Sequence, residues 1–321
     1  MAKLLLITTG GTIASKPTSD SGLLASGAMS GTEVAQLCQL PPSFELQVLP
    51  LFQLPSLHLA SPQLLELKAA IQTAFEDPEL AGIVVTHGTD SLEETAYFLD
   101  VTIHDSRPIV VTGSQRAPGD IGSDVYSNLR NSMFVAVHPS LEDAGTVVVF
   151  NERIWAARYA KKVHASNTQG FESFGYGYLG IIDHDVVTLY QKPLRRDVFR
   201  GVNHLPRVDI VKCFTNADSV ALDAFCEAGT KGLVIEGMGR GQVPPDMVQG
   251  IQRAIKLGVV VVITTSAEEG QVFPAYDYKG SAHQLETMGA VLGKDYDSKK
   301  ARIKLQAVLA SGISPEKAFG R

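Results

Sequence analysis

The sequence predicts an α/β protein in which helices cover both faces of parallel sheets. Short apolar runs alternate with helical patterns along most of the chain, as in βαβ units. Several of these runs end abruptly in glycine and hydroxyl residues, as strands do when their carboxyl ends carry a ligand site. The alternation stops over residues 186–208 and then resumes on a smaller scale. We therefore predict two doubly wound parallel-sheet domains, a larger one at 1–185 and a smaller one at 209–321, joined by a linker.

The individual elements follow from apolar runs, helix-start residues and prolines. In the larger domain we predict strands at 4–7, 44–49, 82–86, 108–112 and 145–150, helices at 31–40, 61–75, 91–99 and 124–137, and a hairpin starting at 151–155. In the smaller domain we predict strands at 209–214, 232–236 and 259–264, and helices at 219–227, 245–257, 281–291 and 298–310. The glycine- and serine-rich segment 14–31 is either a mobile lid or an ordinary surface loop.

Composition limits the partners of the chain. Of its 321 residues, 45% are hydrophobic and 19% are charged, and 28 basic and 34 acidic side chains give a net charge of −6. These values suit a folded globular protein, and the lack of a basic cluster argues against nucleic acid or an anionic membrane as a partner. No apolar run has the length of a membrane span or a signal-peptide core, and the three cysteines lack metal-ligand spacing. We expect a cytoplasmic protein with free thiols.

The turn from His87 to Asp90 is the strongest site candidate. It joins the buried strand at 82–86 to the helix that follows, so it lies at the carboxyl end of the strand. Gly88 allows close approach of the backbone, and the helix N-terminus offers N–H groups to an anion. His87 is either a hydrogen-bonded structural residue or a base. The turn can therefore hold a small carboxylate or an oxyanion.

A second glycine turn ends the first strand, at residues 10–12. A threonine hydroxyl is a weak nucleophile until a neighbouring base takes its proton. Asp90 and Lys162 can supply such a relay for Thr12 or Thr89, provided that the fold brings the lysine to the turn. The alternative is that both threonines only cap helices.

Other common site patterns do not occur in the sequence. A Gly-x-Ser-x-Gly elbow is missing, which argues against an ordinary serine hydrolase. The glycines at 237–241 lack the spacing of a dinucleotide-binding loop. The histidines lack metal-ligand spacing, so we predict no metal site.

The two glycine turns together resemble the signature segments of the bacterial-type L-asparaginase family. Residues 6–14 (LITTGGTIA) resemble the first signature, and residues 82–92 resemble the second, with Ser91 where threonine is commoner. The resemblance continues in the family's order over nearly the whole chain, through the segments at 113–116, 123–129, 162, 237–243 and 300–302. The lack of a signal-peptide core points to the cytoplasmic, type I-like branch of the family.

This resemblance implies an amidohydrolase that converts L-asparagine to L-aspartate and ammonia without a cofactor. It implies that Thr12 is the nucleophile and forms an acyl-enzyme. Thr89, Lys162 and Asp90 would form the activating relay. Backbone N–H groups at Thr12 and Thr89 would hold the oxyanion.

The resemblance also implies substrate-binding positions, which are Gly11, Ser56, Gly88, Thr89, Asp90, Ser114 and Gln242. Ser56 and Asp90 match positions that bind the α-carboxylate and α-amino groups. The Ser114 carbonyl would face the leaving nitrogen. Gln242 would reach a neighbour's site in a homodimer or homotetramer whose active sites lie at the subunit contact.

The chain departs from the family pattern in its loop after the first threonine. Residues 13–31 contain no tyrosine, although the family usually carries one there that bonds to the nucleophile. The residues that can replace it are Ser21, Ser26, Tyr276 and Tyr278. Leu57 also follows Ser56 where an amide or polar side chain is common, which can loosen substrate binding or alter specificity.

Two alternatives to a strict asparaginase remain open. The first is a broader asparaginase–glutaminase. The second is a non-catalytic sensor that binds asparagine or aspartate at a degenerate site, an alternative that the missing tyrosine supports.

Overall fold

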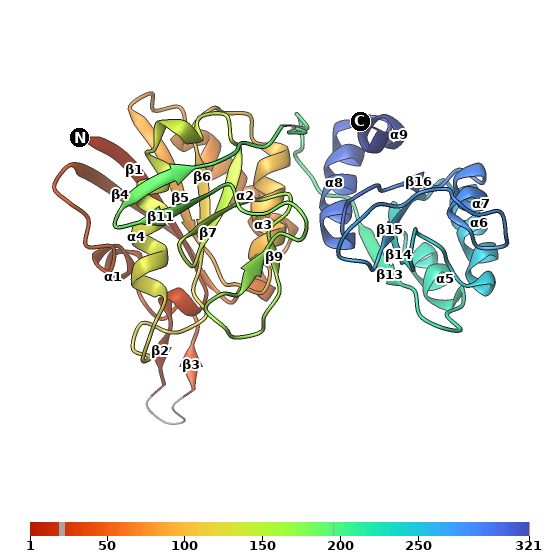
Figure 1. The fold of residues 1–321 in the computed structure, drawn as a ribbon, viewed down its shortest axis with the longest axis horizontal. Helices are drawn as coiled ribbons and strands as arrows, with labels where there is room; N and C mark the ends of the chain where they lie inside the picture. Colours follow the sequence, from red (N-terminus) through yellow and green to blue (C-terminus); the bar gives the residue numbers. More distant parts are fainter. Residues whose placement is uncertain (19–22, 195, 321) are drawn as a thin grey trace. The chain divides into compact units, whose positions relative to one another are not determined.

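The chain folds into two compact units, Met1–Val198 and Phe199–Arg321, in a computed structural model that describes residues 1–18, 23–194 and 196–320 (Figure 1). The division falls within the segment 186–208, which we predicted as the linker. The first residues of that segment were wrongly assigned, because Val186–Leu189 form strand β12 and pair antiparallel with β11 (Gly180–Asp183). Four residues are too few for an alternating pattern to be recognised in the sequence.

The larger unit is built on a mixed sheet whose strand order, within the described ranges, is β12-β11-β8-β7-β6-β5-β1-β4. The parallel strands are β1 (Ala2–Gly10), β4 (Phe44–Leu54), β5 (Leu80–Thr86), β6 (Ile109–Thr112) and β7 (Thr146–Phe150). Strand β8 (Arg153–Ala156) turns back against β7 as the predicted hairpin, and β11 and β12 continue this antiparallel edge. An antiparallel edge on an otherwise parallel sheet is common in α/β folds.

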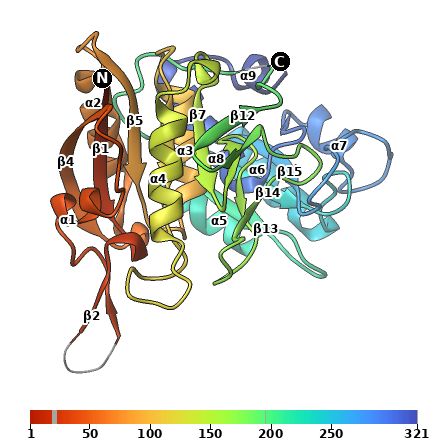
Figure 2. The same cartoon turned by 60° about the vertical axis from the view of Figure 1, so that its left-hand side comes forward.

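Helices cover both faces of this sheet (Figures 1 and 2). Helices α1 (Gly31–Gln36) and α4 (Val125–Ala136) share an apolar core with alternate strand residues such as Leu6, Val84 and Val147. Helices α2 (Ser61–Ala74) and α3 (Leu92–Thr102) pack together on the other face. Because both faces are buried, the central strands β5, β6 and β7 have nearly continuous apolar sequences.

Several short elements connect these helices and strands. The single-turn 3-10 helices are η1 (Thr12–Ala14), η2 (Ser56–His58) and η3 (Pro139–Leu141). Two small hairpins are formed by β2 (Lys16–Pro17) with β3 (Leu24–Ala25), and by β9 (Lys161–Lys162) with β10 (Phe171–Glu172).

The carboxyl ends of β1 and β5 meet at a topological switch point. After β1 the chain crosses to β4 on one side, and after β4 it returns to β5 on the other side. Ligands of doubly wound sheets bind at such points. Thr8 lies opposite Thr86 in the register, and Thr9 Oγ1 donates a hydrogen bond to the Thr86 carbonyl at 2.8 Å. The two strands therefore end level with each other.

The smaller unit has its own parallel sheet, with the order β13-β14-β15-β16 in the part that the structure describes. Its strands are β13 (Val208–Lys212), β14 (Gly232–Gly237), β15 (Val260–Thr265) and β16 (Val291–Leu292). Its helices are α5 (Val220–Glu227), η4 (Pro245–Met247), α6 (Val248–Lys256), α7 (Ala282–Thr287), α8 (Ser298–Ser311) and α9 (Pro315–Gly320). Helices α5, α6 and α7 share one core with the strands, whereas α8 packs on the opposite side (Figure 1).

The predicted fold class is confirmed, since both units are α/β with helices on both faces of their sheets. The helix predicted at 281–291 is too long, because α7 ends at Thr287 and the chain turns at Gly289, where φ is 103°. Residues 291–292 then form β16.

Candidate active site

Two glycine turns meet at the carboxyl ends of β1 and β5. Gly11 has a φ of 83°, and a Cβ atom on it would lie 2.5 Å from the Cα and N atoms of Gly88. Only glycine fits there, because any side chain would overlap the facing backbone. Thr12 directly follows Gly11, and Thr89 directly follows Gly88. The fold therefore brings the two threonine-bearing turns into backbone contact.

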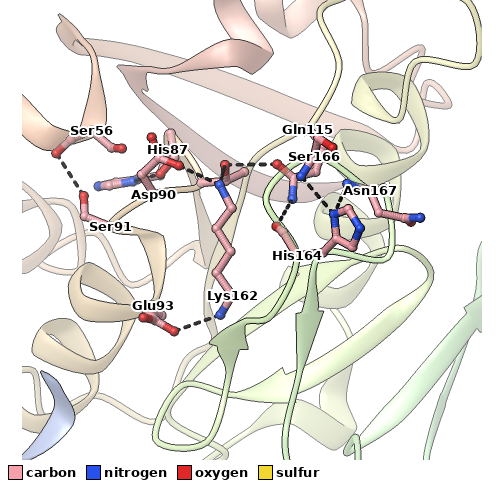
Figure 3. A network of polar contacts seen from close by, with 12 residues as sticks. Ser56, His87, Asp90, Ser91, Glu93, Gln115, Lys162, His164, Ser166 and Asn167 are labelled. Atoms are coloured by element: carbon pink, nitrogen blue, oxygen red, sulfur yellow. Dashed lines mark hydrogen bonds and ion pairs between the residues drawn. The ribbon is translucent and has the colours of Figure 1, made fainter. Parts of the chain in front are cut away.

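Ser56 lies against the second turn. A Cβ atom on Gly88 would lie 2.9 Å from the Cβ and Oγ atoms of Ser56, whose side chain is buried. The Ser56 carbonyl accepts a hydrogen bond from Ser91 Oγ at 2.9 Å (Figure 3). Ser91 immediately precedes α3, so its hydroxyl ties the η2 turn to the start of that helix.

Lys162 reaches the second turn from strand β9. Its Nζ donates hydrogen bonds to Thr89 Oγ1 at 2.8 Å and to Asp90 Oδ1 at 2.6 Å (Figure 3). The lysine side chain is 14% exposed and the aspartate side chain 60%, so water screens the ion pair on the aspartate side. Three of the four predicted catalytic residues thus form one continuous chain of contacts.

His87 is fully buried beside this chain. Its Nδ1 lies 2.8 Å from the Gly88 carbonyl, which can only accept, so Nδ1 carries the proton. Nε2 then accepts a hydrogen bond from Thr95 Oγ1 at 2.9 Å. Burial lowers the pKa of His87 to about 4, and the bond to Gly88 opposes the shift. Of the two alternatives for His87, the hydrogen-bonded structural residue fits these contacts.

A third turn, which follows β6, contributes Gln115. Thr89 Oγ1 donates to Gln115 Oε1 at 3.3 Å, and Gln115 Nε2 donates to the His164 carbonyl at 3.2 Å (Figure 3). The turn itself is held by Asp124, which accepts the backbone N–H groups of Gln115 and Arg116 at 3.0 Å each. Gln115 therefore connects the threonine of one turn to the loop that follows Lys162.

That loop is compact around His164. The His164 Nδ1 atom accepts the backbone N–H groups of Ser166 at 3.0 Å and Asn167 at 2.8 Å (Figure 3). Val163 N donates to the Gly170 carbonyl at 2.8 Å, which closes the base of the loop.

The other predicted binding residues have mixed surroundings. Ser114 is buried in the third turn, where its Oγ donates to the Arg116 carbonyl at 2.7 Å. Leu57 is 73% exposed beside Ser56. Gln242 belongs to the smaller unit, where its backbone pairs with that of Met238 in an isolated antiparallel β-bridge after β14.

The residues considered as substitutes for the loop tyrosine are scattered along the chain. Ser21 lies outside the described residues, and Ser26 is half-buried just after β3. Tyr276 and Tyr278 are about half exposed in the smaller unit, with ring centroids 5.7 Å apart.

Sequence reasoning missed three residues that contact this site, namely Gln115, Ser91 and Glu93. Ser91 was noted only as a departure from threonine, and its bond to Ser56 had no sequence signal. Glu93 accepts the backbone N–H of Lys162 at 2.9 Å. An acidic residue in the first turn of a helix is already favoured by the helix dipole, so the sequence did not distinguish Glu93 from an ordinary helix start.

The described residues offer neither a metal-binding cluster nor a membrane-spanning helix. They contain no group of three or more His, Cys, Asp or Glu residues arranged to hold a metal ion. They also contain no helix with the length and apolar character needed to cross a membrane.

Comparison with known families matches most of the chain. Residues 3–195 match the asparaginase N-terminal domain, and residues 207–318 match the glutaminase/asparaginase C-terminal domain. The chain belongs to the asparaginase family. The resemblance of the two signature turns to this family is thereby confirmed.

Individual members of the asparaginase family align over most of the chain. The L-asparaginase of Bacillus licheniformis is 59% identical over 96% of both chains. The L-asparaginase 2 of Bacillus subtilis (strain 168) is 36% identical over 79% of this chain and 67% of its own. The crystal structure of a probable cytoplasmic L-asparaginase from Campylobacter jejuni matches all of both chains with a TM-score of 0.90 and 27% identity.

Proposed function

We propose that this member of the asparaginase family hydrolyses the side-chain amide of L-asparagine to L-aspartate and ammonia. The hydrogen bonds of Lys162 to Thr89 and Asp90 support the assignment of these three residues as the proton relay. The family relationship supports the reaction. In this proposal Thr12 attacks the amide carbon, ammonia leaves, and water releases aspartate from the acyl-enzyme. The proposed reaction uses no cofactor.

The proposed relay depends on proton transfer between hydroxyl and amine. Lys162 Nζ lies 2.8 Å from Thr89 Oγ1, within reach of a direct transfer, and Asp90 orients the amine from its other side. The Thr89 hydroxyl now donates to Gln115 Oε1. The step therefore requires that the hydroxyl rotate toward Lys162 and that Lys162 react as the uncharged amine, since an ammonium has no lone pair to accept the proton.

The surroundings of the relay suit a zwitterionic substrate. The exposed Asp90 carboxylate can pair with the α-ammonium group, and the Ser56 turn lies beside it against Gly88. Backbone N–H groups of the two abutting turns, at Thr12 and Thr89, are proposed to stabilise the oxyanion as it forms.

The first test is ammonia release from L-asparagine by the wild type, Thr12→Ala and Thr89→Ala. We expect kcat to fall at least about 1,000-fold in both variants, because each removes a hydroxyl that takes part in bond making or proton transfer. Thr287→Ala is the matched control, since Thr287 Oγ1 only bonds to the His283 carbonyl on the surface of α7.

The same assay separates the alternatives. Ammonia release from L-glutamine at a comparable kcat/KM would indicate an asparaginase–glutaminase. No release from either amide, combined with a higher Tm in the presence of asparagine or aspartate, would instead support the sensor. Wild-type activity in Thr12→Ala would contradict the proposed nucleophile.

Assembly and location extend the proposal. We propose a homodimer or homotetramer in which Gln242 reaches a neighbouring active site, as the family resemblance implies. A cytoplasmic location is supported by the similarity to the probable cytoplasmic L-asparaginase of Campylobacter jejuni. Sedimentation velocity of the wild type would give the oligomeric state.

A further inference from the structure

Glu93 is a carboxylate buried in the first turn of α3, next to the proposed relay. Its side chain is 1% exposed. Its Oε2 accepts the backbone N–H of Lys162 at 2.9 Å, although the two residues are 69 positions apart in the chain. A buried carboxylate carries a large desolvation cost, so its retention at this point requires compensating contacts.

The strand that carries Lys162 is weakly supported by its own sheet. Strand β9 is only two residues long and pairs with the equally short β10, where Lys162 lies opposite Phe171. Two-stranded ribbons of this size are marginal in water. The backbone position of Lys162 therefore depends on contacts from outside the hairpin.

Glu93 and the relay hold opposite ends of the lysine. Figure 3 shows Lys162 extended, with its backbone nitrogen at Glu93 and its amine toward Asp90. Glu93 thus fixes the point from which the side chain starts. Glu93 lies in the first turn of α3 and Asp90 on the turn just before it, so one short segment holds both ends of the lysine.

We infer that Glu93 is a positioning residue that keeps the Lys162 amine within proton-transfer distance of Thr89. This inference rests on the proposed function, in which Lys162 acts as the base of the relay. Proton transfer requires heavy-atom distances of about 2.6–3.2 Å, and a displacement of about 1 Å can cost about 100-fold in rate. Without the Glu93 acceptor, the backbone of Lys162 loses the hydrogen bond that fixes its position.

The test compares Glu93→Gln, Glu93→Met and Glu93→Asp. The glutamine amide oxygen can still accept the Lys162 N–H, so we expect kcat within about threefold of the wild type. Methionine is similar in size to glutamate but has no strong hydrogen-bond acceptor. The aspartate side chain is one methylene shorter, so its carboxylate does not reach the Lys162 N–H. We expect kcat to fall at least about 30-fold in both, with KM for L-asparagine within about threefold, because Ser56 and the Asp90 carboxylate are unchanged.

Asp100 supplies a matched control at the other end of α3. It is also buried and accepts a backbone N–H, that of Thr146, at 3.0 Å. We expect Asp100→Ala to lower Tm as Glu93→Met does, but to leave kcat within about twofold. An equal loss of kcat in both variants would reduce Glu93 to a general stabilising residue.

The outcomes distinguish this inference from the proposed function. Inactive wild-type protein overturns the function itself. Active wild type with unchanged kcat in Glu93→Met and Glu93→Asp overturns only the positioning role. Loss of kcat in Glu93→Gln as well would show that the negative charge, and not the position of the acceptor, is what matters. If Glu93→Met does not fold, Glu93→Asp carries the same prediction.

Discussion

His87 makes the stability of the protein depend on pH below neutrality. Burial lowers its pKa from 6.5 to about 4, so the folded state resists protonation where the unfolded chain accepts it. The stabilisation is complete above pH 6.5 and is lost as the pH falls toward 4. Between pH 6.5 and pH 4, we expect the protonation of His87 to lower the free energy of unfolding by about 3 kcal/mol. Denaturant unfolding at pH 7, 5.5 and 4 would measure it.

The comparison for this prediction is His87→Gln, which removes the titrating ring. Its unfolding free energy should decline less steeply with acidity than that of the wild type, because the buried imidazole whose pKa is lowered on folding is then missing. His184→Gln is the control, since His184 is exposed in the turn between β11 and β12. If the unfolding free energies of the wild type and of His87→Gln fall equally with pH, the pH dependence does not come from His87.

At the residue scale, the sequence predicted the groups that lie on turns at strand ends. Thr89 and Asp90 were predicted from their position on the turn. In the structure, Lys162 Nζ lies within hydrogen-bonding distance of both. Glu93 and Gln115 were not predicted as part of the site. Their partners are the Lys162 backbone and the Thr89 hydroxyl, which lie far away in sequence, and no local pattern encodes such pairs.

At the scale of elements, the contact between the two glycine turns is sensitive to substitution. A Gly11→Ala side chain would overlap Gly88 at 2.5 Å and would occupy a left-handed φ of 83°. We expect a loss of about 2 kcal/mol or more in stability and at least about 100-fold in kcat. Chemical denaturation and the ammonia assay measure the two effects.

Gly119→Ala is the control for this substitution. A Cβ atom on Gly119 would meet no atom within 4 Å, and the residue lies exposed on the loop before α4. We expect both its stability and its kcat to stay near those of the wild type. A mild phenotype for Gly11→Ala would mean that the turns separate easily and that their contact is not needed for catalysis.

The long elements were easier to predict than the short ones. Strands buried on both faces and helices of several turns carry enough periodic residues to be recognised, as β5 and α4 do. Strands β9, β10 and β12 have two to four residues each, and their pairing is decided by the chain around them. The antiparallel edge of the first sheet was therefore visible only where the hairpin of β7 and β8 begins.

At the scale of the whole molecule, Arg196 fastens the end of the first unit to α3. Its Nε donates to Asp100 Oδ1 at 3.0 Å, and its Nη2 donates to the Ile103 carbonyl at 2.8 Å. Burial raises the pKa of Asp100, and the nearby guanidinium opposes that shift. We expect Arg196→Met to cost about 3 kcal/mol in calorimetry, because it removes the guanidinium that pairs with a buried carboxylate.

The double variant Asp100→Asn with Arg196→Met tests whether the charge of the buried carboxylate causes the loss of stability. It removes both charges, so it should recover part of the lost stability. The exposed pair of Arg253 and Asp223 is the control, and we expect Arg253→Met to cost less than about 1 kcal/mol. Equal losses at the two pairs would argue against a special role for the buried one.

The distance in sequence between the two halves of the site has a consequence for synthesis. The ribosome makes Thr12 about 150 residues before Lys162. Strands β1 and β5 can pair, and their glycine turns can meet, while the lysine is still unmade. Under the proposed mechanism, the nascent chain carries its nucleophile unactivated until β9 emerges and reaches Glu93. Strand β9 thus completes the proposed relay only after all the parallel strands of the sheet, β1 and β4 to β7, have been made.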